Sequence, residues 1–101
     1  MTSVELLPER VLAGDGHARR HLVEDVYRPL TAERDILVTT LAAWFAHAGS
    51  TEATARGLFV HPNTVRYRLR KITDLLGYDI TRPRDAMLLR VALVLGRARP
   101  L

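Results

Sequence analysis

Polar and basic side chains gather between residues 56 and 71. Residues 1–35 mix both signs of charge, whereas this stretch contains no Asp or Glu and holds Arg56, Arg66, Arg68, Arg70 and Lys71. The chain of 101 residues carries a formal net charge of +4, and a local excess of positive charge favours a polyanionic partner. Guanidinium, amide and hydroxyl groups together are the groups with which proteins bind phosphates and base edges.

The order of these side chains suits one face of a helix. With Val65 as the reference and about 100° per residue, one side of this helix is apolar and the other is polar. The side chains opposite Val65 are Asn63, Tyr67 and Arg70, with Thr64 and Lys71 on one flank, Arg66 on the other, and Arg68 closer to the buried edge. Amide and hydroxyl groups near the start of the helix suit base edges, and guanidinium groups further along suit phosphates or guanine.

The helix that carries this face is predicted at residues 62–76. Pro62 suits its first position, where a backbone N–H has no partner within the helix, and Gly77 suits its end. His61 precedes the helix, and we interpret it as an N-cap, as a phosphate contact, or as both. The residues predicted on the inner face are Val65, Leu69, Ile72 and Leu76.

A shorter helix is predicted directly before it, at residues 51–58. Ser50 offers a capping hydroxyl, and Glu52 gives an acidic first turn. Two helices joined by so tight a turn predict a helix-turn-helix in residues 50–76, with Ala55 as the small residue where the helices cross. Phe59 stands where such turns commonly hold glycine, which predicts a turn that is not of the commonest type.

The remaining segments also show helical spacing rather than the alternation typical of strands. Helices are predicted at residues 3–12, at 17–28 with Pro29 as the stop, at 32–48, and from Pro83 onward. In the helix at 32–48, one apolar stripe is formed by Leu37, Leu41, Trp44 and Ala48, and Gly49 is the predicted cap. The last helix is apolar nearly all round, with Leu89 and Leu93 on the side away from its main apolar face, so something must cover it. The predicted fold is all-α, a compact bundle of five to six helices that contains the helix-turn-helix.

Other chemistry has little support in the sequence. The chain has no cysteine, which excludes disulfides and thiolate metal sites. His17 and His21 have the spacing of a metal pair, but no third ligand is evident, and we interpret them as solvent-facing. Without a nucleophile elbow or a glycine-rich phosphate loop, we expect no enzyme activity, no metal and no cofactor. The lack of an apolar span and of a signal peptide predicts a cytoplasmic protein that makes no use of a membrane.

Residues 58–69, with the sequence LFVHPNTVRYRL, form a long motif that resembles the C-terminal helix-turn-helix domain of PucR-type regulators. These are bacterial proteins named for control of purine catabolism and related to the sugar-diacid regulators. The resemblance extends from about His21 to Gly96. It implies a transcription regulator whose complete form carries upstream sensory and dimerising regions, acts as a homodimer on an operator, and binds its effector outside these residues.

The second helix is also similar to that of the Fis-like helix-turn-helix class, in which residues at the helix start and one turn later contact DNA. By position, this resemblance implies DNA contacts by His61, Asn63, Thr64, Arg66, Tyr67 and Arg68. Arg70 and Lys71, from the polar helix face, complete the set of predicted DNA-binding residues.

The predicted function is therefore sequence-specific binding of double-stranded DNA by a nucleoid-associated protein. Residues 32–101 are predicted to be the DNA-binding domain, and residues 1–31 to be a helical segment that is the tail of an upstream region or part of the bundle. Two alternatives remain open. One is a helical protein-interaction or dimerisation module without DNA binding, and the other is an RNA-binding module, for which only Tyr67 offers an exposed stacking ring.

Overall fold

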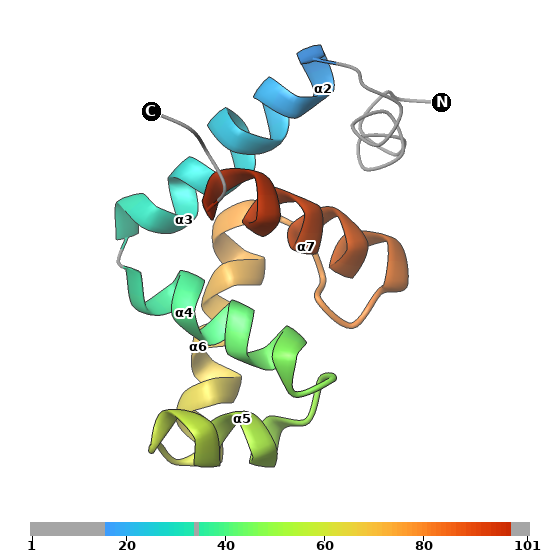
Figure 1. Ribbon diagram of the computed structural model, residues 1–101. Helices are drawn as coiled ribbons and strands as arrows, with labels where there is room; N and C mark the ends of the chain where they lie inside the picture. Colours follow the sequence, from blue (N-terminus) through green and yellow to red (C-terminus); the bar gives the residue numbers. More distant parts are fainter. Residues whose placement is uncertain (1–15, 34, 98–101) are drawn as a thin grey trace.

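The computed structural model describes residues 16–33 and 35–97, and every regular element in them is helical (Figure 1). The elements are α2 (Gly16–His21), the π-helix η2 (Leu22–Tyr27), α3 (Arg28–Glu33), α4 (Asp35–Ala46), α5 (Thr51–Leu58), α6 (Pro62–Leu76) and α7 (Pro83–Arg97). Because α2, η2 and α3 follow one another without interruption, the described residues form five helical segments. The predicted all-α bundle is confirmed. The helix predicted at residues 3–12 lies outside the described residues.

Pro29 does not stop its helix, so the prediction made from it is wrong. The helix continues through Pro29 to Glu33, and the next one, predicted from residue 32, begins at Asp35. The cause is the π turn before the proline, in which the backbone N–H of Arg28 bonds to the carbonyl of Val23, five residues back. A proline fits inside a helix where the regular i to i−4 hydrogen bonds are already interrupted, as they are by this π turn.

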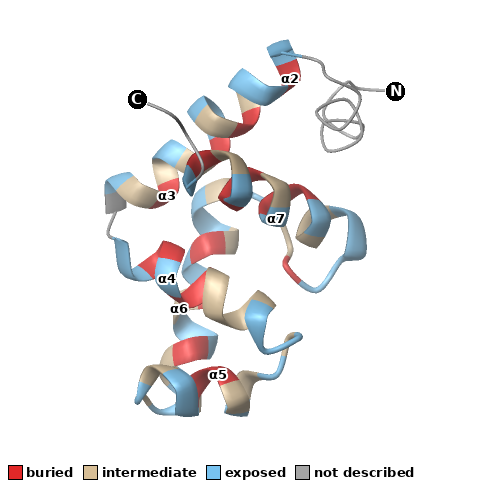
Figure 2. Cartoon of the chain, in the orientation of Figure 1, coloured by how far each residue is buried: buried red, intermediate tan, exposed pale blue. Residues whose placement is uncertain are grey.

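The last helix is turned differently from the prediction. Leu89 and Leu93 are buried rather than spare, and the exposed large apolar side chains on α7 are Val94, at 61 % exposure, and Met87, at 37 %. The reason is that α7 packs against η2 (Figure 2), so the side of α7 that the sequence analysis left open is covered. The surface around Leu89 and Leu93 is therefore not available for self-association.

The helix α4 ends at Ala46, and the turn of residues 47–50 joins it to the start of α5. Leu37 and Leu41 are buried as predicted, and Val38 joins them. Ala48 was expected on the same apolar stripe, but it lies exposed in the turn after the helix, with a positive φ of 54°. Gly49 follows with φ 79°, and its N–H bonds to the Trp44 carbonyl at 2.9 Å, which confirms the predicted glycine cap.

The helix α6 runs through the middle of the molecule, and α5 crosses it at one end (Figure 1). It contacts α3, α4 and α5. The residues that α6 buries in this arrangement are Val65, Leu69 and Ile72. The helices α3, α4 and α5 thus cover one face of α6 and leave its other face open.

Gly96 on α7 provides a test of the packing between α7 and η2. A Cβ added at Gly96 would overlap the base of the Tyr27 ring, so we expect Gly96→Ala to lower the free energy of unfolding by about 1–3 kcal/mol through overpacking. The matched control is Gly57→Ala in α5. There the atoms nearest to an added Cβ all belong to the imidazole of the exposed His47 side chain, with Nε2 at 2.8 Å, and the gain in helix propensity is about 1 kcal/mol.

Thermal melts followed by circular dichroism measure both variants. A Gly96→Ala chain as stable as the Gly57→Ala chain would contradict the packing described for α7.

Candidate nucleic-acid interface

The first helix of the pair begins and ends as the sequence predicts. Ser50 has extended backbone angles, and its Oγ accepts a hydrogen bond from the Ala53 N–H at 3.1 Å, which makes it the N-cap of α5. The Thr54 hydroxyl donates to the Ser50 carbonyl at 2.7 Å and closes the first turn. Ala55 is buried. A small side chain at this position allows α5 and α6 to cross closely.

The turn between α5 and α6 has the geometry that glycine favours, although its residue is Phe59. Phe59 is left-handed, with φ 59° and ψ 44°. The Val60 N–H reaches back to the Ala55 carbonyl at 3.0 Å, and the Phe59 N–H bonds to the Arg56 carbonyl at 3.3 Å. These are the bonds of a Schellman turn. The ring is 94 % exposed, so no packing compensates for a conformation that costs a non-glycine residue about 1–2 kcal/mol.

The start of α6 is fixed by the imidazole of His61. Its Nδ1 accepts a hydrogen bond from the Asn63 N–H at 3.0 Å, and Pro62 occupies the first helical position. Of the roles considered for His61, the cap is therefore present in the structure. At the other end, Gly77 is left-handed with φ 79°, and its N–H bonds to the Thr73 carbonyl at 2.7 Å.

The rotation of α6 agrees with the sequence analysis. Its inner face is buried, and Leu76 packs against the same core. Of the predicted contact residues on α6, Asn63, Arg66, Tyr67, Arg70 and Lys71 are exposed, whereas Thr64 and Arg68 are half-buried. Tyr67 is 59 % exposed and lies among the arginines of the polar face. The structure thus brings five of the predicted contact residues together on one open face of a helix.

Two arginines of α6 are held by side-chain hydrogen bonds. Arg66 donates from Nη1 to the Asn63 Oδ1 at 2.7 Å, on the exposed face. Arg68 turns toward α4 and donates from Nη1 to the Thr40 Oγ1 at 3.3 Å. Thr40 is buried, and its hydroxyl donates in turn to the Ile36 carbonyl at 2.7 Å. Sequence reasoning missed Thr40, because a threonine within an apolar helix gives no signal of a partner 28 residues away.

Arg66 and Arg70 line a shallow depression of about 420 Å³ beside α6. Its other polar lining includes Thr51 at the start of α5 and Thr73. Asp79 lines it too. The Thr81 hydroxyl and N–H donate to the Asp79 carboxylate and hold its pKa below the usual range, with Arg82 adding to the effect. The depression therefore has two cations and hydroxyl groups near α5 and α6, and a persistent negative charge in the loop between α6 and α7.

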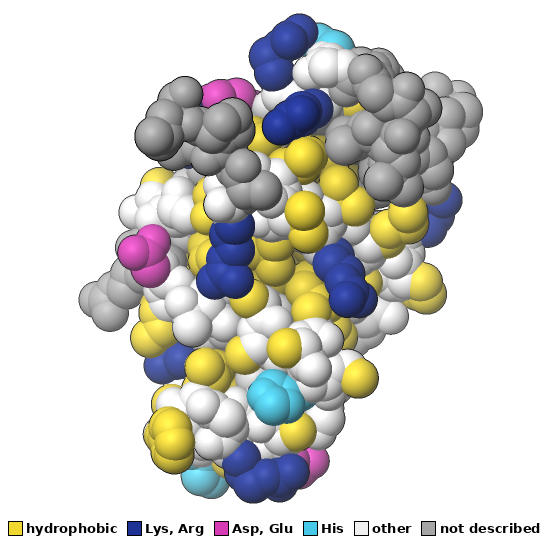
Figure 3. All heavy atoms as spheres, viewed as in Figure 1, with side chains coloured by type: hydrophobic (Ala, Val, Ile, Leu, Met, Phe, Trp, Pro, Cys, Tyr) yellow, Lys and Arg dark blue, Asp and Glu magenta, His cyan; other side chains and the backbone are white. Residues whose placement is uncertain are grey.

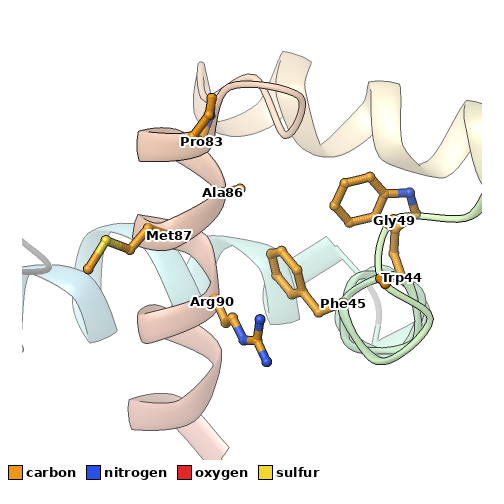
Figure 4. A pocket seen from close by; sticks show the side chains of 8 residues that line it. Trp44, Phe45, Gly49, Pro83, Ala86, Met87 and Arg90 are labelled. Atoms are coloured by element: carbon orange, nitrogen blue, oxygen red, sulfur yellow. The ribbon is translucent and has the colours of Figure 1, made fainter.

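A second hollow, of about 380 Å³, lies between the end of α4 and the start of α7. Phe45 points from α4 toward α7, Trp44 lies beside Gly49, and Met87 points away from the hollow (Figure 4). The Arg90 guanidinium carbon lies 5.8 Å from the centre of the Phe45 ring, a cation–π distance. Hydrophobic side chains gather over the middle of the face shown in Figure 3, with Lys and Arg close to them. This hollow between α4 and α7, called the apolar groove below, is lined by apolar side chains and one cation, Arg90.

The described ranges hold neither a cluster of metal-ligating side chains nor a helix that could cross a membrane. Within residues 16–33 and 35–97, no group of three or more His, Asp or Glu side chains is placed to hold a metal ion. His21, which has the spacing of a metal pair with His17, bonds through Nδ1 to the Asp25 carboxylate at 2.7 Å. None of the described helices has the length and hydropathy needed to cross a bilayer.

Comparison with known proteins agrees with this geometry. The family model described as the PucR C-terminal helix-turn-helix domain matches residues 37–95. An uncharacterised protein of Mycobacterium tuberculosis is 56 % identical over 93 residues, which are 92 % of this chain and 22 % of that protein. The carbohydrate diacid regulator of Escherichia coli is 42 % identical over 89 residues, 87 % of this chain and 23 % of the regulator.

Among solved structures, a regulator of polyketide synthase expression from Bifidobacterium adolescentis superposes with a TM-score of 0.88 at 46 % identity. The match covers 96 % of this chain and 39 % of that one. The chain thus spans about a quarter or less of the length of the two relatives above.

The left-handed Phe59 predicts an unusual gain of stability. We expect Phe59→Gly to raise the free energy of unfolding by about 1 kcal/mol, because glycine adopts this conformation without strain. Phe59→Ala is the matched control. It removes the same exposed ring but keeps a Cβ in the left-handed region, so it should change stability little.

Urea unfolding of the three chains gives the comparison. If Phe59→Ala stabilises the chain as much as Phe59→Gly, the ring and not the backbone is the source of the strain.

Proposed function

We propose that this chain, which belongs to the family of PucR C-terminal helix-turn-helix domains, binds double-stranded DNA sequence-specifically as part of a bacterial transcription regulator. One observation carries the proposal. The face of α6 opposite its buried residues is open and presents amide, phenol, guanidinium and ammonium groups, and the first carboxylate on the helix is Asp74. The family is one of regulatory domains, so catalysis has no part in the proposal.

In this proposal α6 lies in the major groove, which is about 12 Å wide and accepts a helix. The 15 residues of α6 extend about 22 Å, at 1.5 Å each. Its N-terminal turn enters first, so Asn63 and Thr64 meet base edges. Tyr67, Arg70 and Lys71 follow and meet bases or phosphates as the helix leaves the groove, and His61 adds a contact through the ring nitrogen that does not cap the helix.

The phosphate backbone has a suitable site beside α6. Arg70 lines the depression together with Thr51, and the N-terminal end of α5 adds the positive end of a helix dipole. Arg66 lines it too and, beside its bond to Asn63, keeps N–H groups for a phosphate. On the other flank of α6, Arg68 is the cation that contacts a phosphate. A guanidinium has five N–H groups, so the bond from Arg68 to Thr40 leaves donors for a phosphate.

The complete regulator is proposed to bind as a homodimer to paired half-sites and to sense its effector through regions outside this chain. The relatives are about four times longer than the matched segment, which leaves room for such regions. A DNA-bound role implies a nucleoid-associated protein of the cytoplasm. Fusion of the chain to an unrelated dimeriser should raise its affinity for paired half-sites, and equal affinity of the fused and free chains would contradict a dimer requirement.

A protein-interaction module is the second candidate function, and the apolar groove between α4 and α7 favours it. The two candidates differ in their dependence on salt. Contacts with phosphates release counterions, so DNA affinity falls as salt rises. A module that works only through the apolar groove has no such dependence.

The test is a salt titration of binding to genomic duplex fragments. We expect affinity to fall steeply with salt, and Arg70→Met to lower the slope of log affinity against log salt by about 1. Arg90→Met is the matched control. It removes an equal charge from the exposed side chain of Arg90 on α7, which is outside the set of predicted DNA-binding residues, and should leave the slope unchanged.

Two results would overturn the proposal. One is the absence of salt-dependent binding by the unaltered chain, and the other is an equal change of slope in both variants.

A further inference from the structure

Asn63 makes two hydrogen bonds near the start of α6. Its backbone N–H donates to the His61 ring, and its side-chain oxygen accepts from Arg66. The last contact fixes the orientation of the amide. A guanidinium only donates, so the atom of Asn63 that faces Arg66 at 2.7 Å has to be the carbonyl oxygen. The amide NH₂ of Asn63 is then directed away from Arg66.

An unrestrained asparagine pairs with adenine, since it donates to N7 and accepts from the N6 amino group. Asn63 lacks this freedom, because its side-chain oxygen already accepts a hydrogen bond from Arg66. To accept from adenine N6, its oxygen would have to use its second lone pair, and the adenine amino group would come beside the cationic Arg66. The N–H donors of Arg66 would then face the N–H donors of the adenine amino group. Guanine has the same N7 but carries the acceptor O6 in place of the amino group, so at this position it meets N–H groups from both residues.

We infer that Asn63 and Arg66 act as one unit that selects guanine over adenine, and that Arg66 is the positioning residue that sets the base preference of Asn63. The inference rests on the proposed function and adds the identity of one operator base to it. A cation that only contacts phosphate weakens binding to all sequences alike. Arg66 differs because its loss would free the Asn63 oxygen and allow the adenine pairing.

Arg70 provides the matched comparison. It is exposed on the same helix and lines the same depression as Arg66, but it lies seven residues beyond Asn63, about 10 Å along the axis. Arg70→Met and Arg66→Met therefore remove the same charge, and only Arg66→Met releases Asn63. Arg66→Lys keeps both the charge and a donor that reaches one turn back along the helix.

The experiment selects bound duplexes from a random pool with the 101-residue chain and each variant, after melting curves show that all are folded. Asn63→Ala first identifies the base pair that depends on Asn63. There we expect guanine in the unaltered chain and in Arg66→Lys, and a fall of the guanine-to-adenine ratio by about tenfold in Arg66→Met, the scale of one bidentate contact. Arg70→Met should weaken binding to all duplexes and keep the guanine.

The outcomes separate this inference from the proposed function. If the unaltered chain shows no salt-sensitive binding to any duplex, the proposed function fails and the inference fails with it. If binding is salt-sensitive but adenine is preferred at the Asn63-dependent position, only the inference fails. The same holds if Arg66→Met weakens all sequences alike, as Arg70→Met does, because Arg66 is then a phosphate contact and nothing more.

Discussion

The burial of one face of α6 determines what the other face can do. Val65, Leu69 and Ile72 pack into the core formed with α3, α4 and α5. Burying an aliphatic side chain of this size stabilises the fold by about 1.5–3 kcal/mol, whereas an exposed ion pair such as Glu24 with Arg28 contributes about 0–1 kcal/mol. Packing therefore fixes the rotation of α6 about its axis, and the polar face follows from that rotation.

The ends of the two crossing helices are fixed by local hydrogen bonds. Ser50 and His61 cap α5 and α6, and Gly77 ends α6 in a left-handed conformation. Phe59 is the exception to this local agreement, since it holds a glycine-like turn with an exposed aromatic ring. Backbone strain of this kind is retained when the surrounding structure determines the conformation. Here the two N-caps and the buried crossing at Ala55 restrict the conformation of the turn.

The sequence predicts the helix-turn-helix closely and the rest of the bundle less well. The limits of α5 and α6 agree with the prediction because their signals lie within a few residues of each end: a capping side chain, an N-terminal proline and a C-terminal glycine. The helix through Pro29 and the buried side of α7 were predicted wrongly. Both depend on tertiary structure, the first on a π turn and the second on packing against η2, and no local pattern contains that information.

The same distinction applies to the candidate site. Exposure of Asn63, Tyr67 and Arg70 follows from helix periodicity, so the sequence was sufficient for it. The bonds of Arg66 and Arg68 were not predicted. A long arginine side chain reaches several neighbours, and its choice among them depends on the position of α4 and on the capped start of α6.

In the proposed function, the open face of α6 contacts DNA. Backbone amide chemical shifts of the ¹⁵N-labelled chain, followed by NMR during titration with a duplex it binds, locate the contact residue by residue. The largest changes are expected at residues 61–71 and at Thr51, with small changes on α7. Changes centred on the groove of Trp44, Phe45 and Arg90, with none along α6, would contradict the account.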